Sequence, residues 1–203
     1  MSIVRYDPFR DLRTLQEEVN RLFSTNLNRS FGDEGIGRGA WNPSVDIFAP
    51  LSADETGVLA QAAVSHVFAP GETVIRAGEP GSSMFVVHNG RVRVQINENG
   101  RPRTVATLNE GDFFGEMGMM TGDPRSATVI ALSDVECYRV DKEAFHDIMQ
   151  SRPEIAEDIS EVLARRRVEL DAAREDLNEE AKRARLRQHQ GDLLNRIKHF
   201  FGL

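Results

Sequence analysis

A short segment of the chain combines glycines with one acidic and one basic side chain, a combination that can bind a phosphorylated sugar. Residues 114–129 read Phe-Gly-Glu-Met-Gly-Met-Met-Thr-Gly-Asp-Pro-Arg-Ser-Ala-Thr-Val. Gly115 has no Cβ, so the backbone there can approach a ligand closely. The residues from Glu116 to Met120 can form one helical turn, and the first N–H groups of such a turn are available to bind an anion.

The two charged side chains of this segment predict which parts of a ligand it binds. Arg125 follows Glu116 by nine positions, a distance that lets the chain loop back over the same pocket. The planar guanidinium of an arginine can bind two phosphate oxygens at once. A carboxylate repels a phosphate, so the natural target of Glu116 is a sugar hydroxyl. Together the two side chains predict a nucleotide whose phosphate lies close to its own ribose.

The same segment resembles the phosphate-binding cassette of the cyclic nucleotide-binding domain, which occurs in cyclic-AMP-dependent kinase regulatory subunits, catabolite-activator-type transcription factors and cyclic-nucleotide-gated channels. Residues 68–90 and 108–115 resemble the first strands of that family and the approach to the cassette. The resemblance covers residues 50–150. It implies a mainly β fold with helical extensions: an antiparallel β jelly-roll barrel flanked by α-helices, with a long C-terminal helix.

The resemblance also implies the roles of individual residues. Glu116 is expected to accept the ribose 2′-hydroxyl, and Arg125 is expected to pair with the cyclic phosphate. Backbone N–H groups near Gly115, Met117 and Gly118 would complete the phosphate site. An alternative is that Glu116 and Arg125 form a structural salt bridge in a pocket that binds no nucleotide. The full set of expected ligand-binding residues is Phe114, Gly115, Glu116, Met117, Gly118, Arg125 and Ser126.

Ser126 bears on the identity of the base. It occupies the position after the arginine, where kinase-type domains usually carry alanine and catabolite-activator-type domains carry serine. Its hydroxyl can reach a phosphate oxygen or a guanine amino group. The expected ligand is therefore cAMP or cGMP, with cAMP favoured.

The composition limits the other classes of function. The chain has 203 residues and a formal net charge of −7, whereas general nucleic-acid binders are normally basic. No apolar run approaches the roughly 20 residues that span a membrane, and acidic residues interrupt the start of the chain, unlike in a signal peptide. The single cysteine, Cys137, cannot form an internal disulfide and is interpreted as a packed small hydrophobic residue. We therefore expect a cytoplasmic protein with no transmembrane segment and no nucleic-acid partner.

The first part of the chain, residues 1–48, is expected to be an amphipathic N-terminal arm and linker. Asp7-Pro8 is a helix-start signal, and apolar residues then recur at helical spacing. Residues 6–12 and 41–48 resemble the N-terminal arm and first strand of a bacterial small heat-shock protein of the Hsp20 family. This resemblance stops at Phe48, so the chain looks like a junction of two unrelated families. One alternative function is accordingly a small heat-shock-type oligomerising or chaperone fusion.

The second part, residues 49–150, has the pattern of a β-barrel. Ser52 is expected to cap a helix that extends to Ala63. Short runs rich in valine and isoleucine follow, with glycine-bearing turns between them. Asn99-Gly100 is a strong hairpin signal. The expected strands lie at residues 74–75, 85–87, 92–96, 105–108, 128–131 and 137–140.

The third part, residues 151–203, is expected to be a helical stem. Its apolar residues approximate a heptad stripe that Arg166 interrupts. The pattern fits a solvated helix with a narrow packing face, or a coiled coil that joins copies of the chain. The N-terminal arm is the other candidate contact for a homo-oligomer. Gly191 is expected to interrupt the stem, and Asp192 to cap a short amphipathic helix that can pack on the protein, on a partner or on a membrane surface.

An enzymatic function is not expected. A cupin-type metalloenzyme uses the same class of barrel but needs clustered histidines and an acid as metal ligands. The sequence also suggests no nucleophile with a neighbouring base. No metal is expected, because the histidines are not clustered, and no cofactor is expected apart from the nucleotide ligand. The five histidines are scattered along the chain: His66, His88, His146, His189 and His199.

The function expected from the sequence is a regulatory module that binds a cyclic nucleotide. Binding would draw the C-terminal helices over the pocket or change oligomer contacts, with Ile155 and Ile159 as candidates to cover the base. The end of the chain resembles bacterial mechanosensitive-type channels that carry a cyclic nucleotide domain, so a channel is a candidate partner. An alternative is a catabolite-activator-like transcription regulator, although the region after Ile155 lacks two short helices joined by a tight glycine turn.

Overall fold

The computed structural model describes residues 47–48, 50–98, 100–175 and 179–203. The expected N-terminal arm lies almost entirely outside these residues, so its helix and its resemblance to small heat-shock proteins stay predictions, as do the limits of the three expected parts. Along the described chain the elements are α2 (Ala53–Ala62), β1 (Val64–Phe68), β2 (Thr73–Ile75), β3 (Ser83–Asn89), β4 (Val92–Glu98), β5 (Arg101–Leu108), β6 (Phe113–Phe114), α3 (Glu116–Thr121), β7 (Thr128–Ala131), β8 (Val135–Asp141), α4 (Lys142–Ser151), α5 (Ile155–Glu175) and α6 (Glu179–Phe201).

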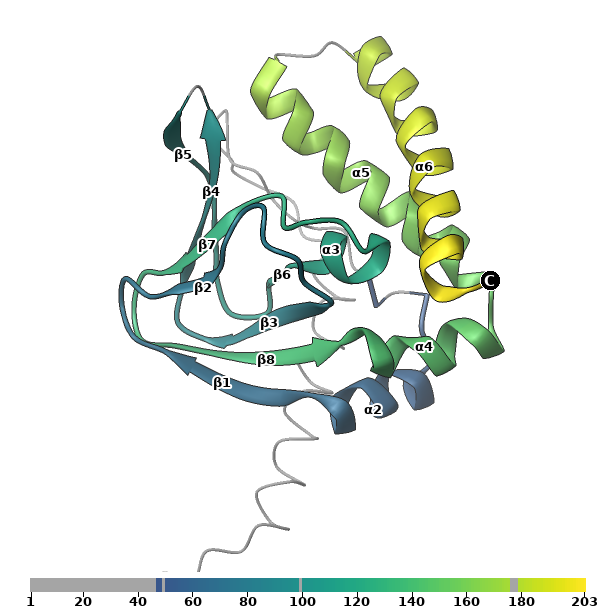
Figure 1. The fold of residues 1–203 in the computed structure, drawn as a ribbon, viewed down its shortest axis with the longest axis horizontal. Helices are drawn as coiled ribbons and strands as arrows, with labels where there is room; N and C mark the ends of the chain where they lie inside the picture. Colours follow the sequence, from purple (N-terminus) through teal and green to yellow (C-terminus); the bar gives the residue numbers. More distant parts are fainter. Residues whose placement is uncertain (1–46, 49, 99, 176–178) are drawn as a thin grey trace, which may run out of the picture.

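The strands form two antiparallel sheets that pack against each other, with the helices gathered at one end (Figure 1). The strand orders are β1-β8-β3-β6 and β2-β7-β4-β5. All six strands expected between residues 74 and 140 are present, and the mainly β fold with flanking helices is confirmed. Among the described strands the two sheets of this jelly-roll-like fold do not close into a continuous barrel, because backbone pairing does not continue between them and the edge strand β6 is only two residues long.

Two hydrophobic clusters lie on opposite faces of the sheet β1-β8-β3-β6. Successive side chains of a strand point to opposite faces, so in β3 Met84 and Val86 join one cluster and Phe85 and Val87 join the other. The cluster between the sheets includes Cys137, which is fully buried, and burial raises the pKa of its thiol to about 12. The interpretation of this cysteine as a packed hydrophobic residue is confirmed.

The other cluster joins the sheet to the helices. Its members include Ile47 and Phe48, which lie in a turn, so the short strand expected at residues 41–48 is wrong at its described end. The ring of Phe48 packs edge-on against that of Phe113, with 5.9 Å between ring centroids. The end of the N-terminal arm is therefore part of the core.

Helix α2 begins where the sequence predicts. The backbone N–H of Ser52 donates to Glu55 Oε2 over 2.7 Å, and the N–H of Glu55 donates to Ser52 Oγ over 3.3 Å. Each side chain satisfies a backbone donor that the first helical turn leaves without a partner. The expected helix start at Ser52 is confirmed.

The C-terminal region folds into a helical hairpin, in which α5 and α6 lie side by side (Figure 1). Helix α6 continues through Gly191 to Phe201, so the expected interruption at Gly191 and the cap at Asp192 are wrong. A glycine inside a helix costs about 1 kcal/mol relative to alanine. Burial of Leu193 and Ile197 offsets this cost, since each buried aliphatic side chain contributes roughly 1.5–3 kcal/mol.

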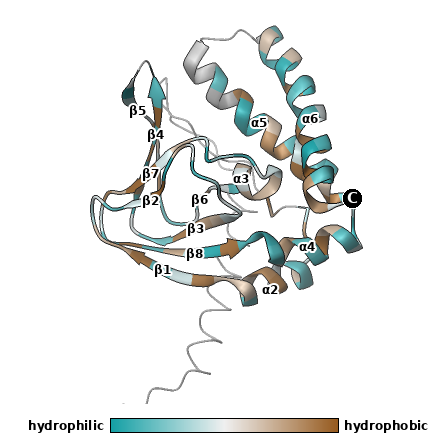
Figure 2. Ribbon diagram, viewed as in Figure 1, coloured by the Kyte–Doolittle hydropathy of each residue, from teal (hydrophilic) through white to brown (hydrophobic). Residues whose placement is uncertain are grey.

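The hairpin is not uniformly apolar. Hydrophobic residues gather where α5 and α6 meet α3 and α4, and the coloured part of α6 farther from this end is mostly hydrophilic (Figure 2). The apolar end therefore docks the hairpin onto the rest of the fold. Within the described residues, no helix is both long and apolar enough to cross a membrane.

Candidate functional site

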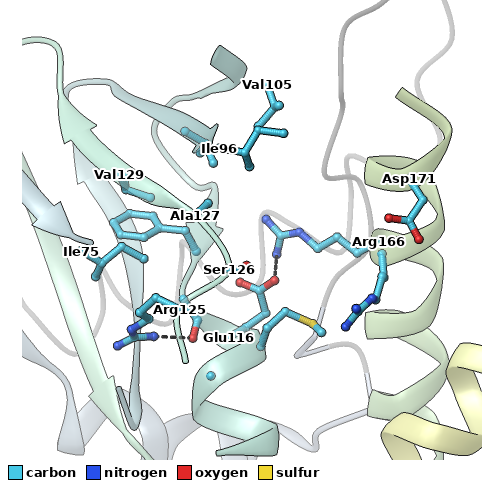
Figure 3. A pocket seen from close by; sticks show the side chains of 16 residues that line it. Ile75, Ile96, Val105, Glu116, Arg125, Ser126, Ala127, Val129, Arg166 and Asp171 are labelled. Carbon is cyan, nitrogen blue, oxygen red and sulfur yellow. Dashed lines mark hydrogen bonds and ion pairs between the residues drawn. The ribbon is translucent and has the colours of Figure 1, made fainter. Parts of the chain in front are cut away.

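A pocket lies between the sheet β2-β7-β4-β5, helix α3 and helix α5 (Figure 3). Its volume is about 190 Å³. The sheet provides an apolar wall, which can shield the flat faces of an aromatic ring from water. The residues of this wall are Ile75, Val94, Ile96, Val105, Ala127 and Val129.

The N-terminus of α3 forms one end of the pocket. Gly115 precedes this helix with a φ of 86°, a left-handed conformation that glycine adopts without a steric penalty. The first helical hydrogen bond runs from Met119 N to Gly115 O over 3.3 Å. The N–H groups of Glu116, Met117 and Gly118 come before this first helical hydrogen bond. They are therefore available to bind an anion.

Arg125 lies at the same end of the pocket and is 7% exposed. Its Nη1 donates to Ser83 O over 2.6 Å and to Gly115 O over 2.7 Å, and its Nη2 donates to Ser83 Oγ over 3.0 Å. Burial lowers the pKa of Arg125, while the nearby charge of Glu116 raises it and that of Arg139 lowers it. The guanidinium is thus oriented by backbone carbonyls and lies within electrostatic range of the acid.

Two glycines make room for this guanidinium. A Cβ added at Gly81 would lie 2.2 Å from Arg125 Nε, and one at Gly115 would lie 2.8 Å from Arg125 Nη1. Real Cβ contacts do not occur at such distances, so a larger residue at either position would displace the arginine. Gly81 lies between two of the expected strands, and its contact with Arg125 depends on the approach of two segments that are distant in sequence.

Glu116 faces the pocket from the first turn of α3 and pairs with a cation from α5. Its side chain is 7% exposed, and Oε1 lies 3.2 Å from Nη1 of Arg166, whose side chain is 2% exposed. The contact is an ion pair and not a well-aligned hydrogen bond. Arg166 Nη2 also donates to Phe113 O over 2.8 Å, and the guanidinium carbon lies 4.3 Å from the centroid of the Phe113 ring.

The structure brings all the expected ligand-binding residues around this pocket. They come from β6, from α3 and from the loop that precedes β7. Glu116 and Arg125 do not form the salt bridge with each other that was considered as an alternative, because Glu116 pairs with Arg166. The residues are Phe114, Gly115, Glu116, Met117, Gly118, Arg125 and Ser126.

The C-terminal helices were expected to cover the pocket, but the α5 residues that line it were not identified from the sequence. Arg166, Arg167 and Asp171 line it. Ile155 and Ile159, the candidates to cover a base, are instead fully buried in the hydrophobic cluster beneath the hairpin, so that assignment is wrong. Both lie a few turns before the pocket-facing stretch of α5. The interruption of the heptad stripe by Arg166 is the only sequence signal that pointed to this side of the site.

Comparison with known proteins gives a consistent result. Residues 65–152 match the family model described as the cyclic nucleotide-binding domain. A cGMP-dependent protein kinase of Plasmodium berghei is 32% identical over 127 residues, which are 63% of this chain and 13% of the kinase. A cAMP-dependent protein kinase regulatory subunit of Yarrowia lipolytica is 34% identical over 105 residues, which are 52% of this chain and 28% of the subunit.

The fold also matches solved structures. The catabolite activator protein of Thermus thermophilus aligns with a TM-score of 0.55 at 22% identity, over 79% of this chain and 87% of that protein. At this identity the similarity shows the shared fold alone. The chain spans less than a third of the length of the two kinase-related proteins, so the similarity to them concerns one domain of each.

Proposed function

We propose that the chain, whose residues 65–152 match the cyclic nucleotide-binding domain, is a regulatory module that binds cAMP or cGMP in the pocket between α3 and α5. The observation that carries the proposal is the presence of Glu116, Arg125 and an apolar wall around one pocket. A cyclic nucleotide holds its phosphate and its 2′-hydroxyl on one rigid pair of fused rings, with the base attached to the sugar. Its three parts match the basic, acidic and apolar parts of the pocket.

Arg125 is the proposed phosphate ligand. Its hydrogen bonds to Ser83 and Gly115 use three of the five N–H donors of a guanidinium. The donor on Nε and one on Nη2 make no hydrogen bond with any residue that the structure describes. Two donors on neighbouring nitrogens suit two phosphate oxygens. The N–H groups of Met117 and Gly118 would complete the phosphate site.

Glu116 is the proposed acceptor for the ribose 2′-hydroxyl, and the aliphatic wall is the proposed site for the base. Ser126 is exposed at the pocket, where its hydroxyl can bond a phosphate oxygen or a guanine amino group. The names of the related kinase proteins include both cGMP and cAMP, and we favour cAMP for this chain. In this proposal the chain is a sensor and performs no chemical reaction.

The proposed output is the α5–α6 hairpin. Helix α5 lines the pocket, and α6 contacts α3 and α4, so both helices adjoin the ligand site. A ligand shifts the equilibrium between two arrangements of such an element only by its difference in affinity for them. One proposed partner is a second copy of the chain, bound through the hairpin or the N-terminal arm. The other is a channel or a membrane surface, and the proposed location of the chain is the cytoplasm. The transcription-regulator and chaperone alternatives gain no specific support.

Titration calorimetry with cAMP, cGMP and the linear nucleotide 5′-AMP tests the proposed function. We expect one cyclic nucleotide to bind at least about tenfold more tightly than 5′-AMP, because cyclisation holds the phosphate and the 2′-hydroxyl at a fixed spacing before binding. If neither cyclic nucleotide gives a binding heat, or if 5′-AMP binds equally well, the proposed function is wrong.

A further inference from the structure

Glu116, the proposed ribose acceptor, is held in the pocket by Arg166, which comes from a distant part of the chain. We propose that Arg166 is a positioning residue for the ribose. It orients the carboxylate of Glu116 toward the 2′-hydroxyl, and the pair stays intact when the nucleotide binds. This inference rests on the proposed function and adds the α5 side of the pocket to it.

The position of Arg166 is fixed from several directions. Its guanidinium pairs with Glu116, donates to Phe113 O and lies over the Phe113 ring. Its neighbours along α5, Leu163 and Ala164, are fully buried in the core. Figure 3 shows Arg166 reaching from α5 to the carboxylate of Glu116. A side chain held in this way can set the orientation of the carboxylate that it contacts.

Magnitudes decide whether the ribose displaces Arg166 or binds beside it. A hydrogen bond from a hydroxyl to a charged group changes an equilibrium constant roughly 10- to 150-fold. Leaving one partner of a buried ion pair without its counter-charge changes an equilibrium constant roughly 150- to 5,000-fold. Glu116 and Arg166 are both almost completely buried. The binding free energy gained from the hydroxyl is therefore smaller than the free energy lost by separating the two side chains. The nucleotide therefore binds Glu116 with Arg166 in place.

The carboxylate has the capacity to bind both groups. An ionised carboxylate offers about four acceptor sites. Among the described residues, Arg166 is the only one that forms an ion pair or hydrogen bond with the Glu116 carboxylate. A sugar hydroxyl can therefore be added without the loss of an existing contact. In the arrangement of the hairpin that the structure describes, the α5 wall of the site is already formed.

The test compares cAMP with 2′-deoxy-cAMP, which differ only in the hydroxyl that Glu116 is proposed to accept. In the unaltered protein we expect the deoxy analogue to bind roughly 10- to 150-fold more weakly. In Arg166→Met, which keeps much of the side-chain length without the charge, we expect this ratio to fall below about threefold because the carboxylate is no longer oriented. In Arg166→Lys, which keeps the charge but not the planar fork, we expect an intermediate ratio.

Arg165→Met is the matched control, since Arg165 is the preceding residue on α5 and its side chain is 55% exposed. It should keep the ratio of the unaltered protein. A purely structural role for Arg166 would weaken both nucleotides equally and leave the ratio unchanged, which overturns the inference. Tighter binding of cAMP by Arg166→Met would mean that Arg166 competes with the ribose, which also overturns it.

The two proposals fail in different ways. Absence of binding by the unaltered protein overturns the proposed function itself. Binding with an unchanged ratio in the Arg166 variants overturns only the inference about Arg166. If Arg166→Met does not fold, Arg166→Lys decides the matter, because a ratio equal to that of the unaltered protein contradicts the proposed role.

Discussion

The two buried arginines of the pocket are held by different kinds of structure. Arg125 is fixed by the backbone carbonyls of Ser83 and Gly115, next to the turn that carries Glu116. Arg166 comes from α5 and meets Glu116 only because the C-terminal hairpin docks against the sheets. The comparison teaches that the proposed phosphate end of the site combines one short segment with backbone support from β3, whereas the proposed ribose end depends on the packing of a distant helix.

Helix α3 connects the two halves of the site. Its N-terminus faces the pocket, and its C-terminus receives α6, where Arg196 pairs with Asp123 and the Phe200 ring lies against Gly122. Lys142 of α4 secures the same end of α6 by donating to Phe200 O over 2.8 Å. Helix α3 has six residues and rises about 1.5 Å per residue. Its pocket-facing N-terminus and the C-terminus that contacts α6 are therefore roughly 9 Å apart.

The sharpest test of the phosphate end is Arg125→Ala. The variant loses two charge-assisted hydrogen bonds to the phosphate, each contributing roughly 1.5–3 kcal/mol, so we expect the Kd for the cyclic nucleotide to rise at least about 100-fold in calorimetry. Arg165→Ala, at an exposed position, serves as the control. An affinity equal to that of the unaltered protein would refute the assignment of Arg125.

Gly81→Ala tests whether nucleotide affinity depends on the space around Arg125 as well as on its charge. The new Cβ would lie 2.2 Å from Arg125 Nε and force the guanidinium to move. We expect the loss of about one charge-assisted hydrogen bond, a rise in Kd of roughly 10- to 100-fold. The control is Gly57→Ala, where no atom lies within 4 Å of the new Cβ. Equal affinities of the two variants would contradict the proposed role of Gly81.

Gly122→Ala tests the docking of the hairpin on the cassette. Gly122 has a φ of 73°, and a Cβ there would lie 2.6 Å from the Phe200 ring. An alanine in this conformation costs about 1–2 kcal/mol, and displacement of the ring adds to the loss in free energy of unfolding measured with urea. Gly202→Ala has the same φ but no neighbour within 4 Å. If both variants lose the same stability, the contact with Phe200 is unimportant.

The smallest expected effect belongs to Arg196→Ala. The ion pair of Arg196 with Asp123 is partly exposed, with side chains 45% and 27% accessible. Pairs of this kind contribute about 0–1 kcal/mol, and salt weakens them. We expect a loss of less than about 1 kcal/mol in urea unfolding at low salt, and almost none at 1 M salt. A larger loss that persists at high salt would show that Arg196 packs the hairpin rather than pairing electrostatically.

The parts of the site that could be predicted from the sequence share one property, which is that they form over a short stretch of chain. The turn at Gly115, the helical turn that follows it and the position of Arg125 lie within residues 114–126. The strands expected between residues 74 and 140 and the helix start at Ser52 were likewise predicted from local patterns, and each is present, whereas β6 within that range was not predicted. Such features depend on backbone geometry and on neighbouring side chains.

Other features were decided only when distant segments met. Glycine at position 191 suggested a helix break, but packing of α6 on α5 outweighs the cost of that one residue. Arg166 interrupts an apolar stripe, and no local pattern identifies its partner as a carboxylate fifty positions earlier. The sequence alone therefore determined the turn that is proposed to bind the phosphate and the type of sheet. Only tertiary packing decided which helix closes the pocket and which charge stands beside Glu116, because a buried charge selects its partner through the geometry of the whole fold.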